Sequence, residues 1–102
     1  MRRYNKTIPL GLVTLLLGLL LAACAGPPVQ EMSDARQAIQ AAEEAGAEQH
    51  APVPLRQARG YLDSAESKLQ KRAFNGARKD ARLAREKATE AMSVAHRSSE
   101  PD

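Results

Sequence analysis

The chain has 102 residues, a formal net charge of +3, one cysteine and no tryptophan. This length allows one small domain at most, and a single cysteine excludes an internal disulfide. The positive charge comes from the start of the chain: three of the 15 Lys and Arg residues, Arg2, Arg3 and Lys6, precede Cys24, whereas all 12 acidic residues follow it. From Cys24 onward the side chains therefore sum to zero, which argues against binding to nucleic acid.

Residues 1–23 have the layout of a secretory signal peptide. Residues 1–6 are basic, and residues 8–21 are apolar apart from Thr14. About 14 apolar residues are fewer than the roughly 20 that a membrane span requires. Small residues follow at the place where a cleavage site is expected. We therefore expect this segment to be cleaved, and the alternative is an uncleaved membrane anchor.

The motif Leu21-Ala22-Ala23-Cys24 resembles the lipobox of bacterial lipoproteins at all four positions. The resemblance implies cleavage before Cys24 and transfer of a diacylglycerol, with acyl chains such as palmitate, to its thiol. A thiolate is a good nucleophile for such a transfer, and two or more acyl chains anchor a protein stably. Ala25, where an Asp would indicate the inner membrane, favours the outer membrane. The alternative is that Cys24 is an ordinary buried thiol.

Residues 24–32 are expected to comprise the lipidated cysteine and a tether. They contain Gly26-Pro27-Pro28, and two consecutive prolines favour an extended polyproline conformation. Eight extended residues would reach about 25 Å. We therefore expect the tether to lift the folded part away from the membrane.

Residues 33–97 predict an all-α domain, either a small antiparallel bundle of three helices or a helical hairpin. The first helix is expected at residues 33–45, with Ser33 as its N-cap and Gly46 as its C-cap. Small and apolar residues recur on one face of this helix. They are Ala35, Ala38, Ile39, Ala42 and Ala45.

The second helix is expected from Pro52 or Pro54 to about Gln70, because proline suits the first turn of a helix. Its apolar residues repeat at intervals of three and four, which is a heptad pattern. They are Leu55, Ala58, Leu62, Ala65 and Leu69. Asn75-Gly76 then indicates a turn or the start of a helix.

The third helix is expected from about Asn75 to Ala95 or His96, followed by a polar tail over residues 98–102. Its seam consists of alanine alone, at positions Ala77, Ala81, Ala84, Ala88, Ala91 and Ala95. Such a seam allows two helix axes to approach closely, so that close backbone contact replaces bulky side chains. Tyr61 and Phe74 are the expected aromatic residues of this alanine-lined core.

Basic residues concentrate between positions 68 and 87, where eight Lys and Arg residues accompany only Asp80 and Glu86. One interpretation is contact with an anionic envelope polymer, such as peptidoglycan carboxylates or lipid phosphates, or with an acidic protein face. The residues expected to make this contact are Lys71, Arg72, Arg78, Arg82 and Arg85. The alternative is a solvated helix face that pairs with the acidic first helix and internally through Arg82 and Glu86.

No constellation of residues indicates a reaction. His50 and His96 are far apart and no second cysteine is present, whereas a metal site needs three or four ligands within reach. The sequence contains no glycine-rich phosphate loop, nucleophile elbow or Ser/His/Asp arrangement. Stacking aromatic residues are not interleaved with the basic ones, which disfavours a nucleic-acid partner. We therefore expect a protein that is not an enzyme and that carries no metal or cofactor.

The domain as a whole resembles a family of alanine-rich bacterial lipoproteins known as domain of unknown function 4398. The similarity covers roughly residues 32–91. It is carried by Asp34-Ala35-Arg36, Ala38-Ile39, Gly46-Ala47, Ala51-Pro52, Leu55, Ala58, Leu62, Ala65, Phe74, Ala77, Ala81, Ala84 and Ala88. The resemblance implies residence in the cell envelope and indicates no activity.

Two further resemblances are partial. Phe74, Ala77 and Ala84 resemble half a tetratricopeptide repeat, in which glycine usually stands two residues before the aromatic residue; here that residue is Arg72. The second and third helices could therefore run together as one long helix. The alanine seams are also similar to those of the trimeric coiled-coil lipoprotein that is bonded to peptidoglycan through a C-terminal lysine. This chain ends in Glu100-Pro101-Asp102, which argues against that attachment.

Two functions follow as expectations. The first is a lipoprotein on the periplasmic face of the outer membrane, with a structural or adaptor role, that binds an envelope protein or its own copies through helical seams. The second is a module that binds peptidoglycan or another anionic polymer through its basic helix stripe. In both, the N-terminal lipid contacts the membrane.

Overall fold

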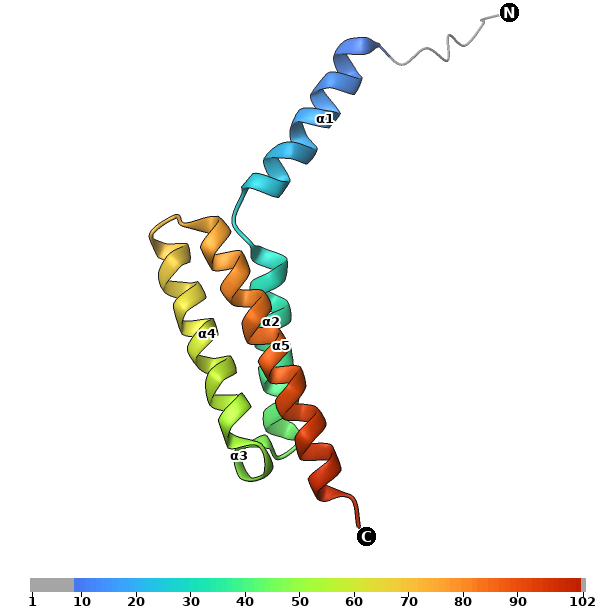
Figure 1. The fold of residues 1–102 in the computed structure, drawn as a ribbon. Helices are drawn as coiled ribbons and strands as arrows, with labels where there is room; N and C mark the ends of the chain where they lie inside the picture. The colour runs from blue at the N-terminus through green and yellow to red at the C-terminus, as the bar shows by residue number, and fades with distance from the viewer. Residues whose placement is uncertain (1–8, 102) are drawn as a thin grey trace, which may run out of the picture.

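The computed structural model describes residues 9–101, except the side chains of residues 20–25. This part of the chain forms five helices and no strands (Figure 1). The helices are α1 (Leu10–Ala25), α2 (Val29–Glu44), α3 (Ala47–His50), α4 (Pro52–Gln70) and α5 (Phe74–Ser99). The predicted all-α fold is therefore confirmed.

Helices α2, α4 and α5 form the bundle, and α5 packs against both of the others along its length. Figure 1 shows that α4 runs antiparallel to α2 and α5. We call the end that holds residues 26–28 and the α4–α5 turn the link end, and the end that holds α3 the distal end. The second helix begins at Pro52, the earlier of the two predicted starts, and the third begins one residue before Asn75 and extends to Ser99.

The alanine seam of α5 is the centre of the bundle. All six alanines that the spacing predicts are 0% exposed. Because a methyl group adds little width, the neighbouring helices can pack close to the α5 backbone. In α4, Leu55, Ala58 and Ala65 are buried, while Leu62 and Leu69 are half-buried at the edge of the core. The predicted seams therefore face one another within a single chain.

The buried apolar residues fall into two clusters, one near each end. The distal cluster consists of Ile39, Ala42, Ala47, Ala51, Leu55, Ala58, Ala88, Ala91 and Ala95. The link-end cluster consists of Met32, Ala35, Ala65, Ala81 and Ala84, with Tyr61 partly buried against it. The prediction of Phe74 as a core residue is wrong, because it is half-buried in the first turn of α5 and belongs to neither cluster.

The start of the first bundle helix was also predicted incorrectly. Helix α2 begins at Val29, and Ser33, the predicted N-cap, lies inside it. The prolines initiate this helix, since the Met32 N–H donates to the Pro28 carbonyl at 3.0 Å, and buried Met32 fixes its first turn in the core. Of the predicted tether, only residues 26–28 lie outside a helix.

Helices α2 and α4 are each followed by a residue in the left-handed conformation, which is a glycine in one turn and an arginine in the other. After α2, Gly46 adopts a left-handed φ of +85°, which fits its predicted role at the C-terminus. After α4, Arg72 adopts a φ of +60°. The Arg72 N–H donates to Leu69 O at 3.0 Å, and the Ala73 N–H donates to Lys68 O at 2.8 Å. This is the Schellman pattern, which usually has glycine at the left-handed position, and it separates α4 from α5.

Helix α1 contains most of the predicted apolar region of the signal peptide. Its leucines from Leu10 to Leu19 are exposed. No helix within residues 9–101 combines the length and the apolar character that crossing a membrane requires. Residues 1–6, the predicted basic start of the signal peptide, lie outside the described residues.

Candidate functional site

The predicted lipidation site lies just before the link. Cys24 belongs to the last turn of α1, and its side chain lies outside the described part of the structure, as do those of Leu21, Ala22 and Ala23. The link itself is held to the bundle at both of its ends. The Gly26 carbonyl accepts a hydrogen bond from Arg78 Nη2 at 2.9 Å, and Pro28 is less than 2% exposed.

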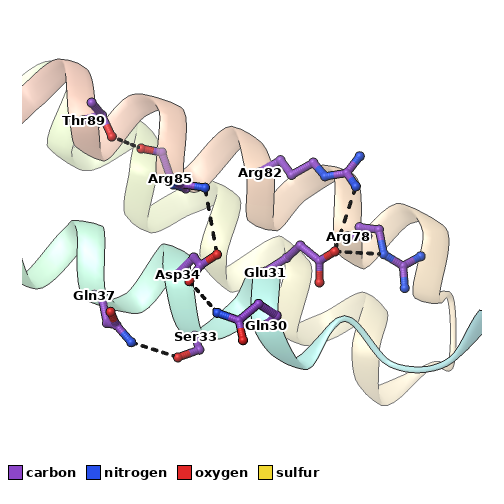
Figure 2. Close-up of polar contacts among 9 residues, drawn as sticks. All are labelled: Gln30, Glu31, Ser33, Asp34, Gln37, Arg78, Arg82, Arg85 and Thr89. Carbon is purple, nitrogen blue, oxygen red and sulfur yellow. Dashed lines mark hydrogen bonds and ion pairs between the residues drawn. The ribbon is translucent and has the colours of Figure 1, made fainter. Parts of the chain in front are cut away.

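Arg78 is the most buried member of the predicted basic stripe, with a side chain that is 15% exposed. Its Nε lies 3.3 Å from Glu31 Oε1 of α2 (Figure 2), while its Nη2 donates to the Gly26 carbonyl of the link. One guanidinium thus joins α5, the first turn of α2 and the backbone of the link. A planar group with several N–H donors suits this three-way contact.

Arg82 and Arg85 continue the stripe along α5 and also face carboxylates of α2. Arg82 lies 3.9 Å from Glu31 and Arg85 lies 3.9 Å from Asp34 (Figure 2). Their side chains are 69% and 64% exposed, so each pair contributes at most about 1 kcal/mol. The ion pair of Arg82 is therefore with the acidic α2 helix, and no pair with Glu86 is found among the described residues.

Lys71 and Arg72, the other two predicted contact residues, are not part of this stripe. Both are exposed in the turn between α4 and α5. Within residues 9–101 neither forms an ion pair. The five predicted residues therefore divide into three that face α2 and two at the tip of the link end.

Within residues 9–101, the most buried charged group is one that the sequence analysis did not predict as a site residue. Asp80 of α5 is 7% exposed, and it accepts hydrogen bonds from Ser64 Oγ at 2.6 Å and Lys68 Nζ at 2.7 Å. Burial acts to raise the pKa of Asp80, but the hydrogen bonds from Lys68 and Ser64 outweigh it and hold the pKa below its usual value. The carboxylate is therefore ionised at neutral pH.

A sequence signal for this network exists. Asp80 stands three residues after Ala77 and four before Ala84, and both intervals place residues on one helix face. Ser64 and Lys68 are likewise one turn apart on α4. An acid on a seam face, opposite a basic residue and a hydroxyl at helical spacing, indicates a buried polar contact.

An open groove of about 370 Å³ lies beside this network. It is lined by Gln57, Gly60, Tyr61, Ser64, Lys68 and Asp80. Nothing lies within 4 Å of the point where a Cβ on Gly60 would stand, so the glycine leaves space in the surface of α4. The groove presents amide, hydroxyl and phenol groups around an aromatic ring, which suits a side chain of a partner protein.

The distal end carries a second polar network. Arg59 of α4 contacts Glu43 of α2 at 3.0 Å and Glu48 of α3 at 2.7 Å. Hydrogen bonds with Glu48 and Glu43 raise the pKa of Arg59 above its usual value. This contact connects three helices at the Gly46 turn. No group of three or more potential metal ligands lies together within the described residues.

Comparison with known proteins identifies the bundle. A family model described as a domain of unknown function (DUF4398) matches residues 30–100. No curated protein and no solved structure gives a match. The matched segment includes nearly all of the residues from α2 to α5 and excludes α1. The chain therefore belongs to the DUF4398 family.

Proposed function

We propose that this protein is a lipoprotein anchored through Cys24 to the periplasmic face of the outer membrane, where its bundle acts as a structural or adaptor module. The observation that carries this proposal is the position of Leu21-Ala22-Ala23-Cys24. The motif ends an apolar segment and stands directly before the link to the bundle. Cleavage and lipidation there would remove the apolar segment and leave the DUF4398 bundle with an anchor of its own.

The partner contact that we propose uses the groove between α4 and α5. The alanines of α5 are 0% exposed within one chain, so they are unavailable to a partner unless the bundle opens. The groove offers Tyr61 and the open space at Gly60 instead. Tethering at a membrane raises the local concentration of such a surface, so that a weak contact can suffice.

Lipidation is tested by mass spectrometry of the full chain produced in bacteria, with Cys24→Ser as the control. We expect the wild-type chain to begin at Cys24 and to carry the mass of a diacylglycerol with additional acyl chain. The Cys24→Ser chain should retain its first 23 residues and lack the lipid. A wild-type chain with residue 1 intact and an unmodified thiol would contradict the proposal, and membrane fractionation would then decide its location.

The adaptor role is tested by a photo-crosslinking residue at Gln57, which is exposed at the groove, and by a matched one at Gln40, which is exposed on α2. We expect a discrete crosslinked species in intact cells from position 57 alone, and its loss in a Tyr61→Ala background. Its mass would distinguish an envelope protein from a second copy. Equal crosslinking from both positions would contradict a specific contact at the groove.

The alternative function, binding of peptidoglycan through the basic stripe, has narrower support. Arg82 and Arg85 remain well exposed, but Arg78 is occupied by Glu31 and the link. A pull-down with peptidoglycan sacculi tests it directly. Salt-sensitive retention that is lost in the Arg82→Glu, Arg85→Glu variant would favour this alternative over the adaptor role.

A further inference from the structure

Charge is distributed unequally along the bundle. Residues 67–79 contain five Lys and Arg residues and no acid, whereas residues 43–55 contain three Glu residues and no Lys or Arg. The first segment includes the end of α4, the turn and the start of α5; the second includes the end of α2, α3 and the start of α4. The basic segment therefore lies at the link end and the acidic one at the distal end (Figure 1).

Two of the basic residues at the link end form ion pairs within the bundle. Lys68 pairs with Asp80, and Arg78 pairs with Glu31. Lys71, Arg72 and Lys79 are exposed and form no ion pair within the described residues. These three residues, which we call the basic tip, leave the link end positively charged toward solvent.

The geometry of the link determines how close this tip comes to a membrane. The Gly26 carbonyl is hydrogen-bonded to Arg78, and α2 begins three residues later at Val29. Cys24 is two residues before that fixed point, which corresponds to about 7 Å of extended chain. The start of α5 lies one helical turn before Arg78, so the α4–α5 turn extends at least as far toward the membrane as the link. A lipid on Cys24 therefore holds the link end against the headgroups.

We propose that the basic tip binds the headgroups of anionic phospholipids and makes the bundle stand on the membrane with its acidic distal end pointing away. This inference rests on the proposed lipidation of Cys24. Each basic residue near an anionic surface strengthens binding roughly fivefold, and the attraction fades within a Debye length. Only the link end lies within that range, so the surface attracts the basic tip, whereas the acidic distal end gains no such attraction.

The α4–α5 turn is consistent with this role. Arg72 occupies the left-handed position with a φ of +60°, where glycine would be unstrained. The arginine places an exposed positive charge in the α4–α5 turn, beside Lys71. At the distal turn the same position holds Gly46, which carries no charge.

The test measures the orientation of the full lipidated chain, purified from bacterial membranes and reconstituted into vesicles. A fluorophore is attached at Gln70→Cys beside the tip or at Gln49→Cys in α3, both exposed positions. Because acylation blocks the thiol of Cys24, the only native cysteine, each label reacts at one site. The vesicles contain phosphatidylcholine alone or mixed with phosphatidylglycerol, with a quencher on the headgroups.

We expect the label at position 70 to be quenched several-fold more than the label at position 49 in vesicles with phosphatidylglycerol, and this difference to shrink in phosphatidylcholine alone. Lys71→Glu with Arg72→Glu should weaken the contact at least about tenfold and abolish the difference. The matched control, Arg56→Glu with Arg97→Glu, makes the same change of charge away from the tip and should preserve it.

The outcomes separate this inference from the proposed function. A lipidated chain whose two labels are quenched equally, or whose difference survives reversal of the tip charges, would overturn the inference alone. A chain whose mass shows no lipid would overturn both proposals. Inorganic phosphate added in solution should leave the quenching difference intact at matched ionic strength, and its loss would mean that the tip binds free phosphate rather than a membrane surface.

Discussion

The distal cluster contains nine buried apolar residues, whereas the link-end cluster contains five. The polar contacts are distributed differently. At the link end, Asp80 is buried and hydrogen-bonded, and Arg78 fixes the link. At the distal end, the Arg59 contacts with Glu43 and Glu48 lie at the surface. The comparison indicates that burial of apolar surface stabilises the distal end, while the link end depends more on charged hydrogen bonds.

This difference has a consequence for how the bundle responds to its surroundings. The stabilisation that comes from buried apolar surface does not depend on ionisation, whereas the stabilisation that comes from buried charged contacts does. The end that we place at the membrane is therefore the end whose stability is sensitive to pH and to nearby charge. Four predictions test this difference between the two ends, from the largest expected effect to the smallest.

Removing the largest fully buried side chain of the distal cluster should destabilise the bundle most. Leu55 is 1% exposed, and Leu→Ala in a buried site costs about 2–5 kcal/mol. Small cores of this kind rarely supply more than about 3–5 kcal/mol. Leu55→Ala should therefore leave the chain largely unfolded at room temperature, as measured by circular dichroism during urea titration. The exposed Val53→Ala should change the midpoint little, and equal effects of the two substitutions would contradict the assignment of the core.

Asp80→Asn should have the next largest effect and should change the pH dependence. The substitution removes a charged acceptor from Lys68 and Ser64, which costs about 1–3 kcal/mol. Because the folded pKa of Asp80 is lowered, its contribution is present above the unfolded pKa of about 4 and is lost as the pH falls through the folded value.

Thermal unfolding between neutral and acidic pH measures this contribution. The wild-type chain should lose stability in acid, and the Asp80→Asn chain should lose less over the same range. Glu86→Gln, at an exposed position on the same helix, serves as the control and should leave the wild-type profile unchanged. Identical acid profiles for wild type and Asp80→Asn would show that the network is not what makes the link end sensitive to pH.

Substitutions at the two left-handed positions should change the stability of the fold in opposite directions. Arg72→Gly should stabilise the fold by about 1 kcal/mol, because it relieves a left-handed conformation in an L-residue. Gly46→Ala should destabilise it by about the same amount for the converse reason. The urea midpoints of the two variants, compared with that of the wild type, measure both changes in stability. A loss of stability in Arg72→Gly would mean that the arginine side chain makes a stabilising contact.

Arg59→Gln should have the smallest effect. Its ion pairs with Glu43 and Glu48 lie at the surface, where such contacts contribute about 0.2–1 kcal/mol and are screened by salt. The wild-type and Arg59→Gln midpoints should converge in high salt. A difference that persists in high salt would place the Arg59 network among the structural contacts, like that of Asp80.

Much of the fold was predictable because helix faces are periodic. The spacing of Ala77, Ala81 and Ala84 fixed which side of the third helix is buried, and Pro52 marked the start of the second. Local chemistry misled the prediction at Ser33, which is a good N-cap by type but lies one turn inside α2. The packing of Met32 and Pro28 into the core determined that boundary, and a capping rule does not include tertiary contacts.

The sequence by itself determined the three long helices of the bundle, apart from the start of α2, and their seams, because these depend on residues that are close along the chain. Only the tertiary structure decided what the charged residues do. Arg78 is 52 positions from Gly26 and Asp80 is 16 from Ser64, so their pairing depends on how the helices align. That alignment divided the basic residues of one sequence segment into two groups. Lys68 and Arg78 pair with carboxylates inside the bundle, and the basic tip stays exposed. The energy of each charge depends on its burial and its neighbours.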